Sequence, residues 1–131
     1  MIYGIGTDLC EIARVEQAIA RHGDRFAERL LGPSELAVYR QRSQKLPVHG
    51  IRYLATRFAA KEAFSKAIGL GIHMPMTWRR CEILKKPSGQ PYIKLHDELD
   101  EWFGQQHLKA HVSVTDEAAY VMAFVVVETI E

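Results

Sequence analysis

The chain has 131 residues, of which 47% are hydrophobic and 25% charged, a composition that fits one globular domain over residues 1–131 and excludes a disordered or fibrous protein. The net charge of +1 conceals an asymmetry, because residues 1–96 carry 16 basic and 8 acidic side chains whereas residues 97–131 carry one basic and eight acidic ones. This asymmetry indicates a surface that presents positive charge to an anionic partner. The longest apolar run, residues 118–127, is about half of what a membrane span needs.

The cysteines and the first residues point to a cellular compartment. Cys10 and Cys81 form no CxxC pair, so a disulfide scaffold and a cysteine-bound zinc are both disfavoured, and we expect two buried thiols. The N-terminal segment lacks the basic region and the uninterrupted apolar stretch of a secretory leader. We therefore expect a cytoplasmic protein with no membrane association.

The first part of the chain predicts one strand followed by helices. Residues 2–9 are β-branched and punctuated by glycine, which predicts a strand that runs into a turn at Thr7–Asp8. Apolar residues then recur at helical spacing, with glycine or proline between the periodic stretches. Three helices are predicted here, over about residues 11–22, 26–31 and 33–42.

The middle of the chain carries the clearest helical pattern. Residues 43–50 are polar and contain Pro47 and Gly50, so we predict a loop. Residues 51–67 then repeat apolar side chains at helical spacing and are followed by Gly69, which predicts a long helix with one buried face.

The last part of the chain predicts strands around one helix. These elements are strands over residues 77–84 and 91–95 joined by a turn, a helix over about 97–106, and strands over 111–115 and 120–128. Both faces of the final strand are apolar, and both must therefore be covered. Helices of the same chain can cover one face, and covering the other could require a neighbouring subunit. The fold class predicted is α+β, with helices packed on a small antiparallel sheet.

Asp8 is the first candidate for chemistry, because it follows an apolar strand that contains Gly4 and Gly6. Glycines at such positions let backbone or ligand approach closely. A carboxylate there could hold a cation that faces a phosphate. The other interpretation is that Asp8 or Thr7 caps the helix that follows.

Glu62 is the second candidate, because it borders the buried stripe of the long helix and stands four residues before Lys66. That spacing also makes an ordinary Glu–Lys surface pair. The surrounding sequence is nevertheless strongly basic, and Glu62 is the only acidic residue in a segment that contains Arg40, Arg42, Lys45, Arg52, Arg57, Lys61 and Lys66. A lone carboxylate among cations suggests a site for magnesium and phosphate, since magnesium takes one or two carboxylates and shares phosphate oxygens and water.

A basic face is predicted on the first helix. Arg14, Arg21 and Arg25 line one side if the helix persists across Gly23, either as a solvated face or as a dock for an acidic partner. Nucleic acid is disfavoured as a partner, because no aromatic RNA-binding motif is present. The six histidines show no metal-binding spacing.

Two segments resemble a known family. Gly4–Ile12 (GIGTDLCEI) and Arg57–Gly69 (RFAAKEAFSKAIG) resemble the two signature motifs of the 4′-phosphopantetheinyl transferases, and in particular of their small bacterial class. The segments Pro87–Tyr92 (PSGQPY) and His111–Glu117 (HVSVTDE) also match in the right order. The resemblance covers essentially the whole chain and implies the fold of that superfamily, as a homotrimer with sites at subunit boundaries.

The resemblance also implies an activity and roles for individual residues. The expected reaction transfers the 4′-phosphopantetheine arm of coenzyme A to a serine of apo-acyl carrier protein, which releases 3′,5′-ADP and supports fatty acid biosynthesis. By position, Asp8 and Glu62 would ligate Mg²⁺, and Lys66 would neutralise or protonate the leaving phosphate. Glu62 would take the serine proton, directly or through a metal-bound water.

Further residues fall where the family contacts its two substrates. The residues that would contact coenzyme A are Arg57, Lys61, Ser88, Gly89, Pro91 and His111. The helix that carries Arg14, Arg21 and Arg25 matches the one that grips the acidic carrier protein. The alternatives are a module of the same fold that binds without turnover, and an unrelated basic RNA-binding domain.

Overall fold

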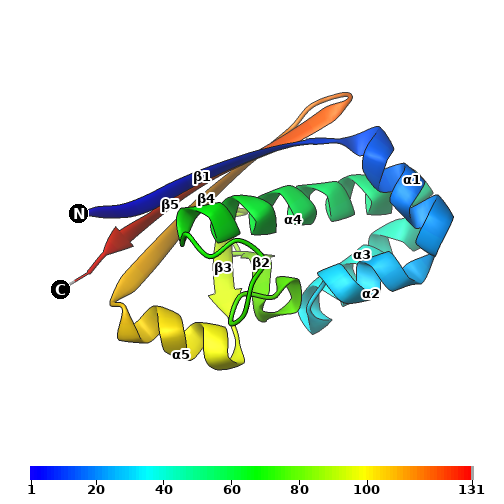
Figure 1. Ribbon diagram of the computed structural model, residues 1–131. Helices are drawn as coiled ribbons and strands as arrows, with labels where there is room; N and C mark the ends of the chain where they lie inside the picture. Colours follow the sequence, from blue (N-terminus) through cyan, green and yellow to red (C-terminus); the bar gives the residue numbers. More distant parts are fainter. Residues whose placement is uncertain (131) are drawn as a thin grey trace.

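The structure, a computed structural model, describes residues 1–130. A three-stranded antiparallel sheet lies along one edge of the molecule, one long helix packs against its inner face, and the remaining helices and a β-hairpin pack around that helix (Figure 1). The elements in chain order are β1 (Ile2–Glu11), α1 (Ile12–His22), α2 (Asp24–Leu30), α3 (Pro33–Lys45), α4 (Pro47–Ala67), the short 3₁₀ helix η1 (Trp78–Arg80), β2 (Cys81–Lys85), β3 (Pro91–Leu95), α5 (Asp97–Gln105), β4 (Leu108–Asp116) and β5 (Tyr120–Thr129).

The sheet has the strand order β1-β5-β4, so the two ends of the chain meet in neighbouring strands. Helix α4 runs along the length of this sheet against one face (Figure 1). Helices α1, α2 and α3 gather around the N-terminal part of α4, and the β2–β3 hairpin and α5 lie on the side of α4 away from β1 (Figure 1). The α+β class predicted from the sequence is confirmed.

Two glycines let the sheet approach α4 at backbone distance. A Cβ atom at Gly6 would lie 1.9 Å from the carbonyl oxygen of Ala63, and one at Gly4 would lie 2.0 Å from that of Ala67. These separations are far below van der Waals contact, so only glycine is tolerated at the two positions. The close approach suggested by the sequence is therefore an approach of the α4 backbone, and it brings the side chains of β1 and α4 together.

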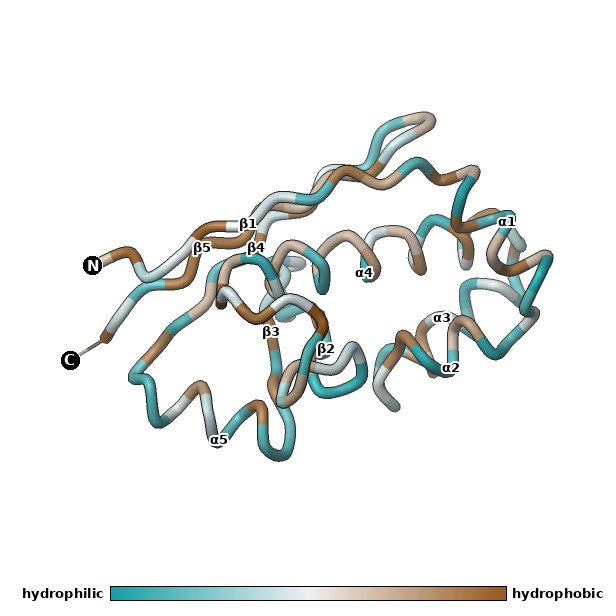
Figure 2. The backbone as a smooth tube through the Cα atoms, in the orientation of Figure 1, coloured by the Kyte–Doolittle hydropathy of each residue, from teal (hydrophilic) through white to brown (hydrophobic). Residues whose placement is uncertain are grey.

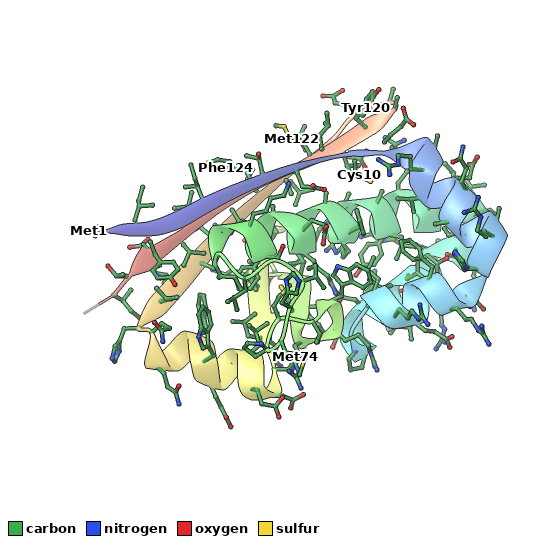
Figure 3. The ribbon with its side chains drawn as sticks, viewed as in Figure 1. Met1, Cys10, Met74, Tyr120, Met122 and Phe124 are labelled. Atoms are coloured by element: carbon green, nitrogen blue, oxygen red, sulfur yellow. The ribbon has the colours of Figure 1, made fainter. Side chains whose placement is uncertain are left out.

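The two faces of β5 have opposite environments. The side chains that face α4, those of Val121, Ala123, Val125 and Val127, are fully buried. Those of Tyr120, Met122 and Phe124 point away from α4 and remain 40–46% exposed (Figure 3). Figure 2 shows that hydrophobic residues recur along both β1 and β5. One face of the sheet is thus covered by the chain's own helix, and the other is an uncovered apolar surface.

Three local predictions were wrong. Residues 43–50 are not a loop, because α3 extends to Lys45 and α4 begins at Pro47, with only Leu46 between them. Proline is well suited to the first turn of a helix, where its missing N–H has no intrahelical partner in any case. Gly50 is a packing residue, since a Cβ there would lie 1.9 Å from Ser43 Oγ.

The other two errors concern strand ends. β1 passes through Thr7–Asp8 without a turn and stays paired with β5 as far as Glu11, which lies opposite Tyr120. The strand predicted to start at residue 77 starts only at Cys81, because η1 precedes it. Both cysteines are free and buried, as expected. Within residues 1–130, no helix is both long and apolar enough to cross a membrane.

Candidate active site

Asp8 and Lys66 meet where β1 crosses α4. Strand alternation turns Asp8 toward the helix, on the same face as Gly4 and Gly6. Lys66 Nζ lies 3.2 Å from Asp8 Oδ1 and donates a 2.8 Å hydrogen bond to the carbonyl oxygen of Thr7. Asp8 does not cap α1, because the N-cap position is Glu11 and no side chain caps that helix. The interpretation of Asp8 as a helix cap is therefore wrong.

Glu62 lies one helical turn before Lys66 and has a different partner. The indole Nε1 of Trp78 donates a 3.1 Å hydrogen bond to Glu62 Oε2. No ion pair joins Glu62 to Lys66 in the part of the chain that the structure describes. The ordinary surface pair that their spacing allows is not formed, and each side chain is held by another part of the fold.

The two candidate carboxylates line one cleft. This carboxylate cleft has a volume of about 410 Å³ and lies between β1, α1 and α4. Asp8 and Glu62 form its polar part together with Glu11 and Arg14. Its remaining walls are formed by Leu9, Cys10, Val15, Ala18, Phe26 and Phe58. The sequence-based pairing of Asp8 with Glu62 thus corresponds to a shared surface, although the two residues are 54 positions apart.

The carboxylate cleft fits a hard cation such as magnesium. Asp8 and Glu62 come from two different elements and carry carboxylate oxygens, the kind of ligand that magnesium prefers. Among residues 1–130 no group of three or more His, Cys, Asp and Glu side chains is arranged for a metal. An ion held here would have to complete its shell with water and substrate oxygens, as magnesium commonly does.

A second cleft gathers the basic residues. It has a volume of about 680 Å³ and lies between the start of α4, the β2–β3 hairpin and the end of β4. Its basic lining consists of Arg42, Lys45, His49, Arg52, Arg57 and Lys85, and Gly89 and Pro91 of the hairpin also line it. We call it the basic cleft. Such a lining suits an anionic ligand with more than one phosphate.

The seven basic residues that the sequence places around Glu62 are therefore divided between separate places in the fold. Four of the seven, Arg42, Lys45, Arg52 and Arg57, line the basic cleft, and Lys66 alone lies beside Asp8. Arg57 and Glu62 are five residues apart on α4, which corresponds to about 7.5 Å along the helix axis. Helix α4 thus contributes residues to each of the two clefts.

Arg57 is fixed at the wall of the basic cleft. Its Nε donates to the carbonyl oxygen of Ile83 at 3.2 Å, its Nη1 donates to Thr56 Oγ1 at 3.0 Å, and its guanidinium lies 4.3 Å from the centre of the Tyr53 ring. Burial lowers the pKa of Arg57 from its usual value. A guanidinium held in this way is preorganised, so little conformational entropy is lost when a ligand binds beside it.

Arg52 joins α4 to the β4–β5 turn. It lies 2.5 Å from Asp116 Oδ1 and donates to the carbonyl oxygens of Ala118 and Glu117. Among residues 1–130, Asp116 is the one acidic residue that lines the basic cleft, and this contact offsets its charge. The cleft keeps an excess of positive charge as a result.

Lys61, which the sequence places among the ligand contacts, is an interior residue. Its side chain has no exposed surface, and its ammonium group donates to Glu35 Oε1 at 2.6 Å, to Leu30 O at 2.6 Å and to Trp78 O at 2.9 Å. These three bonds use all three of its donors. Burial lowers the pKa of Lys61, and the Glu35 carboxylate opposes that effect. A contact with coenzyme A would require this network to break, so we assign Lys61 a structural role.

Ser88 and His111 lie apart from the carboxylate cleft. Ser88 is exposed on the β2–β3 turn beside Gly89, where its Oγ accepts a 3.4 Å hydrogen bond from the Gln90 N–H. His111 lies opposite Val126 on the uncovered face of the sheet, with its Nε2 2.5 Å from Glu128 Oε2. Within one chain the sheet separates His111 from α4.

The three arginines of the predicted basic face lie on two helices. Gly23 has φ 61° and ends α1 after His22, so Arg25 belongs to α2. Arg14, Arg21 and Arg25 are all exposed, and Arg14 also lines the carboxylate cleft. The condition for one continuous helical face, a helix that persists across Gly23, is not met.

Sequence reasoning missed three residues of the site region. Trp78 contacts Glu62 across 16 positions, and no local pattern marks that contact. His49 lay in a segment interpreted as a loop, and Lys85 stood at the end of a strand with no motif around it. All three are brought in by tertiary packing.

Comparisons with known proteins agree with this geometry. A family profile described as the 4′-phosphopantetheinyl transferase superfamily matches residues 4–125. The holo-[acyl-carrier-protein] synthase of Leptothrix cholodnii is 63% identical over 129 residues, which is 98% of each chain. The crystal structure of the synthase of that name from Neisseria meningitidis superimposes with a TM-score of 0.91 at 38% identity, covering 98% of this chain and 100% of the other.

A third similar protein carries a ligand. The holo-[acyl-carrier-protein] synthase of Helicobacter pylori, solved in complex with coenzyme A, superimposes with a TM-score of 0.78 at 32% identity, covering 95% of this chain and 99% of the other. The profile match and the identities extend over nearly the whole chain. This chain belongs to the 4′-phosphopantetheinyl transferase superfamily and, within it, to the holo-[acyl-carrier-protein] synthases.

Proposed function

We propose that this protein transfers the 4′-phosphopantetheine arm of coenzyme A to a serine hydroxyl of apo-acyl carrier protein and releases 3′,5′-ADP. The observation that carries the proposal is the convergence of Asp8, Glu62 and Lys66 where β1 crosses α4. Family membership and the coenzyme A complex of the Helicobacter pylori relative support it. The basic cleft one to two turns away along α4 supplies room for the nucleotide half of the donor.

The reaction exchanges one phosphorus–oxygen bond for another. The serine oxygen forms a bond to the phosphorus that bears the pantetheine arm, and the bond from that phosphorus to the bridging oxygen breaks. The bridging oxygen leaves as part of 3′,5′-ADP with the electron pair of the broken bond. Phosphoryl transfer of this kind depends mainly on positioning and on neutralisation of charge.

Two residues would handle the proton and the leaving group. The second oxygen of Glu62, Oε1, accepts no hydrogen bond from any residue in the range 1–130 and would take the serine proton. The Lys66 ammonium would neutralise the departing phosphate or give it a proton. Its contact with Asp8 keeps it at the crossing point of β1 and α4.

Magnesium is the proposed cofactor, held by Asp8 and Glu62. Both carboxylates belong to the same cleft, and they meet the requirement for hard oxygen ligands. When bound, the ion would supply positive charge against the pyrophosphate of coenzyme A. Water and phosphate oxygens would complete its coordination.

The basic cleft is the proposed site for the nucleotide half of coenzyme A. Arg57, Gly89 and Pro91 line it, as the family resemblance implies. The structure adds Arg42, Lys45 and His49 as candidates for phosphate contacts, together with Arg52 and Lys85. Ser88 is adjacent on the turn. Several cations facing one space are needed because the ligand carries a pyrophosphate and a 3′-phosphate.

We also propose a homotrimer with sites at the subunit boundaries. The uncovered face of the sheet carries Tyr120, Met122 and Phe124, which are large and apolar, and exposure of such a patch is costly. His111 lies on the same face. In an assembly it would approach the basic cleft of a neighbouring subunit, which accounts for its separation from that cleft within one chain.

The acidic carrier protein is the proposed macromolecular partner, and the exposed arginines Arg14, Arg21 and Arg25 would receive it. Arg14 links this surface to the carboxylate cleft, so a carrier bound here would present its serine to Glu62. Opposite charge would accelerate the encounter. A cytoplasmic location agrees with the two unpaired, buried thiols.

The proposal is tested by following the nucleotide product. The protein is incubated with coenzyme A and Mg²⁺, with or without an apo-acyl carrier protein, and the nucleotides are separated by chromatography. We expect 3′,5′-ADP to form only with the carrier present, in equal amount to the coenzyme A consumed. Coenzyme A binding without any 3′,5′-ADP would contradict the proposal and would indicate a binding module of the same fold.

A further inference from the structure

The Glu62 side chain is held by a residue that no motif marks. Trp78, the first residue of η1, donates its indole Nε1–H to Glu62 Oε2 at 3.1 Å. Indole nitrogen is a donor only and carries no charge. It can therefore fix one carboxylate oxygen while leaving the negative charge of Glu62 available to a cation or a proton.

Trp78 is itself fixed at its backbone and at its ring. Its carbonyl oxygen accepts a 2.9 Å hydrogen bond from the Lys61 ammonium, which is fully buried. Its ring lies 6.1 Å from that of Phe58, and the Phe58 ring lies 6.3 Å from that of Phe26. A side chain anchored in this way does not swing freely, so the direction of its N–H is set by the fold.

Two neighbours on α4 hold the same tryptophan. Lys61 bonds its carbonyl oxygen, and Glu62 accepts its indole N–H. The buried ammonium of Lys61 also bonds Glu35 at the start of α3 and Leu30 at the end of α2. The orientation of Glu62 is thereby connected to the packing of α2, α3 and η1 against α4.

The contact also gives Glu62 a partner other than Lys66. A pair between Glu62 and Lys66 would be compatible with their spacing on α4. Lys66 instead lies against Asp8 and the Thr7 carbonyl, and Glu62 lies against Trp78. The two side chains are therefore held by different partners, Glu62 at the carboxylate cleft and Lys66 beside Asp8.

We propose that Trp78 is a positioning residue: its indole N–H holds Glu62 Oε2 so that Oε1 faces the carboxylate cleft for Mg²⁺ or the serine proton. This inference rests on the proposed function, because it assigns Trp78 a part in the same transfer. Trp78 itself touches neither substrate. Its effect would pass entirely through the orientation of Glu62.

The first test measures the hydrogen bond without any turnover. The chain has two tryptophans, so its ¹H–¹⁵N spectrum contains two indole signals. The signal that disappears in Trp102→Phe belongs to Trp102, and the remaining one belongs to Trp78. In Glu62→Ala we expect the Trp78 indole proton to move upfield and to exchange faster with water, while the Trp102 signal stays in place. Unchanged positions for both signals would overturn the proposal. The measurement does not depend on whether the protein transfers phosphopantetheine. It can therefore contradict the role of Trp78 without contradicting the proposed function.

The second test separates positioning from substrate binding. Trp78→Phe keeps an aromatic ring beside Phe58 but removes the N–H. Loss of a hydrogen bond to a charged group predicts a kcat about tenfold lower, with a higher Mg²⁺ concentration needed for half-maximal rate. The KM values for coenzyme A and for the carrier should be unchanged, because neither binding surface is altered.

A matched control removes the other indole. Trp102 lies on α5, and its side chain forms no hydrogen bond within the described range, so Trp102→Phe should leave kcat and both KM values as in the unmodified protein. Unchanged kcat and Mg²⁺ dependence in Trp78→Phe would contradict the proposal. Equal changes in kcat and both KM values, accompanied by a lower unfolding temperature, would also contradict it, because they would indicate a purely structural role.

Discussion

The ammonium group of Lys66 lies 3.2 Å from the carboxylate of Asp8, although 58 positions separate the two residues. Their contact exists because α4 packs against β1 at backbone distance over Gly4 and Gly6. A larger residue at either glycine would push the strand from the helix and separate these groups. The same packing that builds the core therefore also builds the proposed active site.

Gly6→Ala tests this dependence. The added Cβ would lie 1.9 Å from the Ala63 carbonyl oxygen, and backbone cannot yield as a flexible side chain can. We expect the free energy of unfolding to fall by about 3 kcal/mol, at the upper end of overpacking effects. Chemical denaturation at fixed protein concentration measures the change.

The matched control for Gly6→Ala is Gly104→Ala. Gly104 lies in α5, and nothing lies within 4 Å of a Cβ placed there. Alanine should raise the free energy of unfolding by about 0.5–1 kcal/mol at such a helical position. Equal free energies of unfolding for the two variants would contradict the close approach of β1 to the α4 backbone at Gly6.

Glu62→Gln should abolish most of the transfer activity while leaving the fold intact. The amide oxygen can still accept the Trp78 indole N–H, but the charge needed by a cation or a proton is lost. We expect kcat/KM to fall at least about 100-fold, the scale of effect seen when a group that stabilises developing charge is removed. Initial rates and the unfolding midpoint are measured together.

Glu101→Gln on α5 provides the comparison for that variant, because Glu101 is exposed and lies in neither cleft. It should match the unmodified protein in rate. Near-normal activity of Glu62→Gln would mean that Glu62 neither ligates the ion nor takes the proton.

Lys61→Met distinguishes a structural lysine from a ligand contact. The variant removes the cation from the buried Glu35 carboxylate, which should cost about 3–5 kcal/mol of stability. Lys86→Met, in the exposed β2–β3 turn, should cost almost nothing. Denaturation curves give the stabilities. A Lys61→Met protein of unchanged stability with a raised KM for coenzyme A would restore the original sequence-based assignment.

Arg21→Glu should weaken the binding of the carrier protein and leave the binding of coenzyme A unchanged. Arg21 is exposed at the end of α1 and lines neither cleft, so its reversal changes only the charge offered to an acidic partner. We expect the KM for the carrier to rise about tenfold at low salt, and the difference to shrink as salt screens the charges. Lys94→Glu on β3 is the control for a charge reversal elsewhere. Equal increases in both KM values for Arg21→Glu would contradict the docking surface.

Much of the fold follows from local pattern. The apolar spacing of residues 51–67 predicted α4, and the two-sided apolar character of residues 120–128 predicted a strand covered on one face by helices. The junction at Leu46 was missed because proline and glycine usually end helices. Here Pro47 starts a helix and Gly50 packs against Ser43, and only the tertiary structure distinguishes these uses.

The candidate site was predictable where a motif carried it. Asp8, Glu62 and Lys66 were identified from the two signature segments, and the structure places all three at one crossing point. Trp78 could not be found in this way, since its contact depends on how η1 packs against α4. The burial of Lys61 could not be deduced from its place in a motif, because its partner Glu35 lies 26 positions away.

The most direct test of the account is the intact mass of an apo-acyl carrier protein after incubation with this protein, coenzyme A and Mg²⁺. We predict that the carrier gains the mass of one phosphopantetheine group, that fragmentation locates it on a single serine, and that Glu62→Gln gives almost no product in the same time. A carrier of unchanged mass in the presence of the folded, unmodified protein would contradict the proposed transfer.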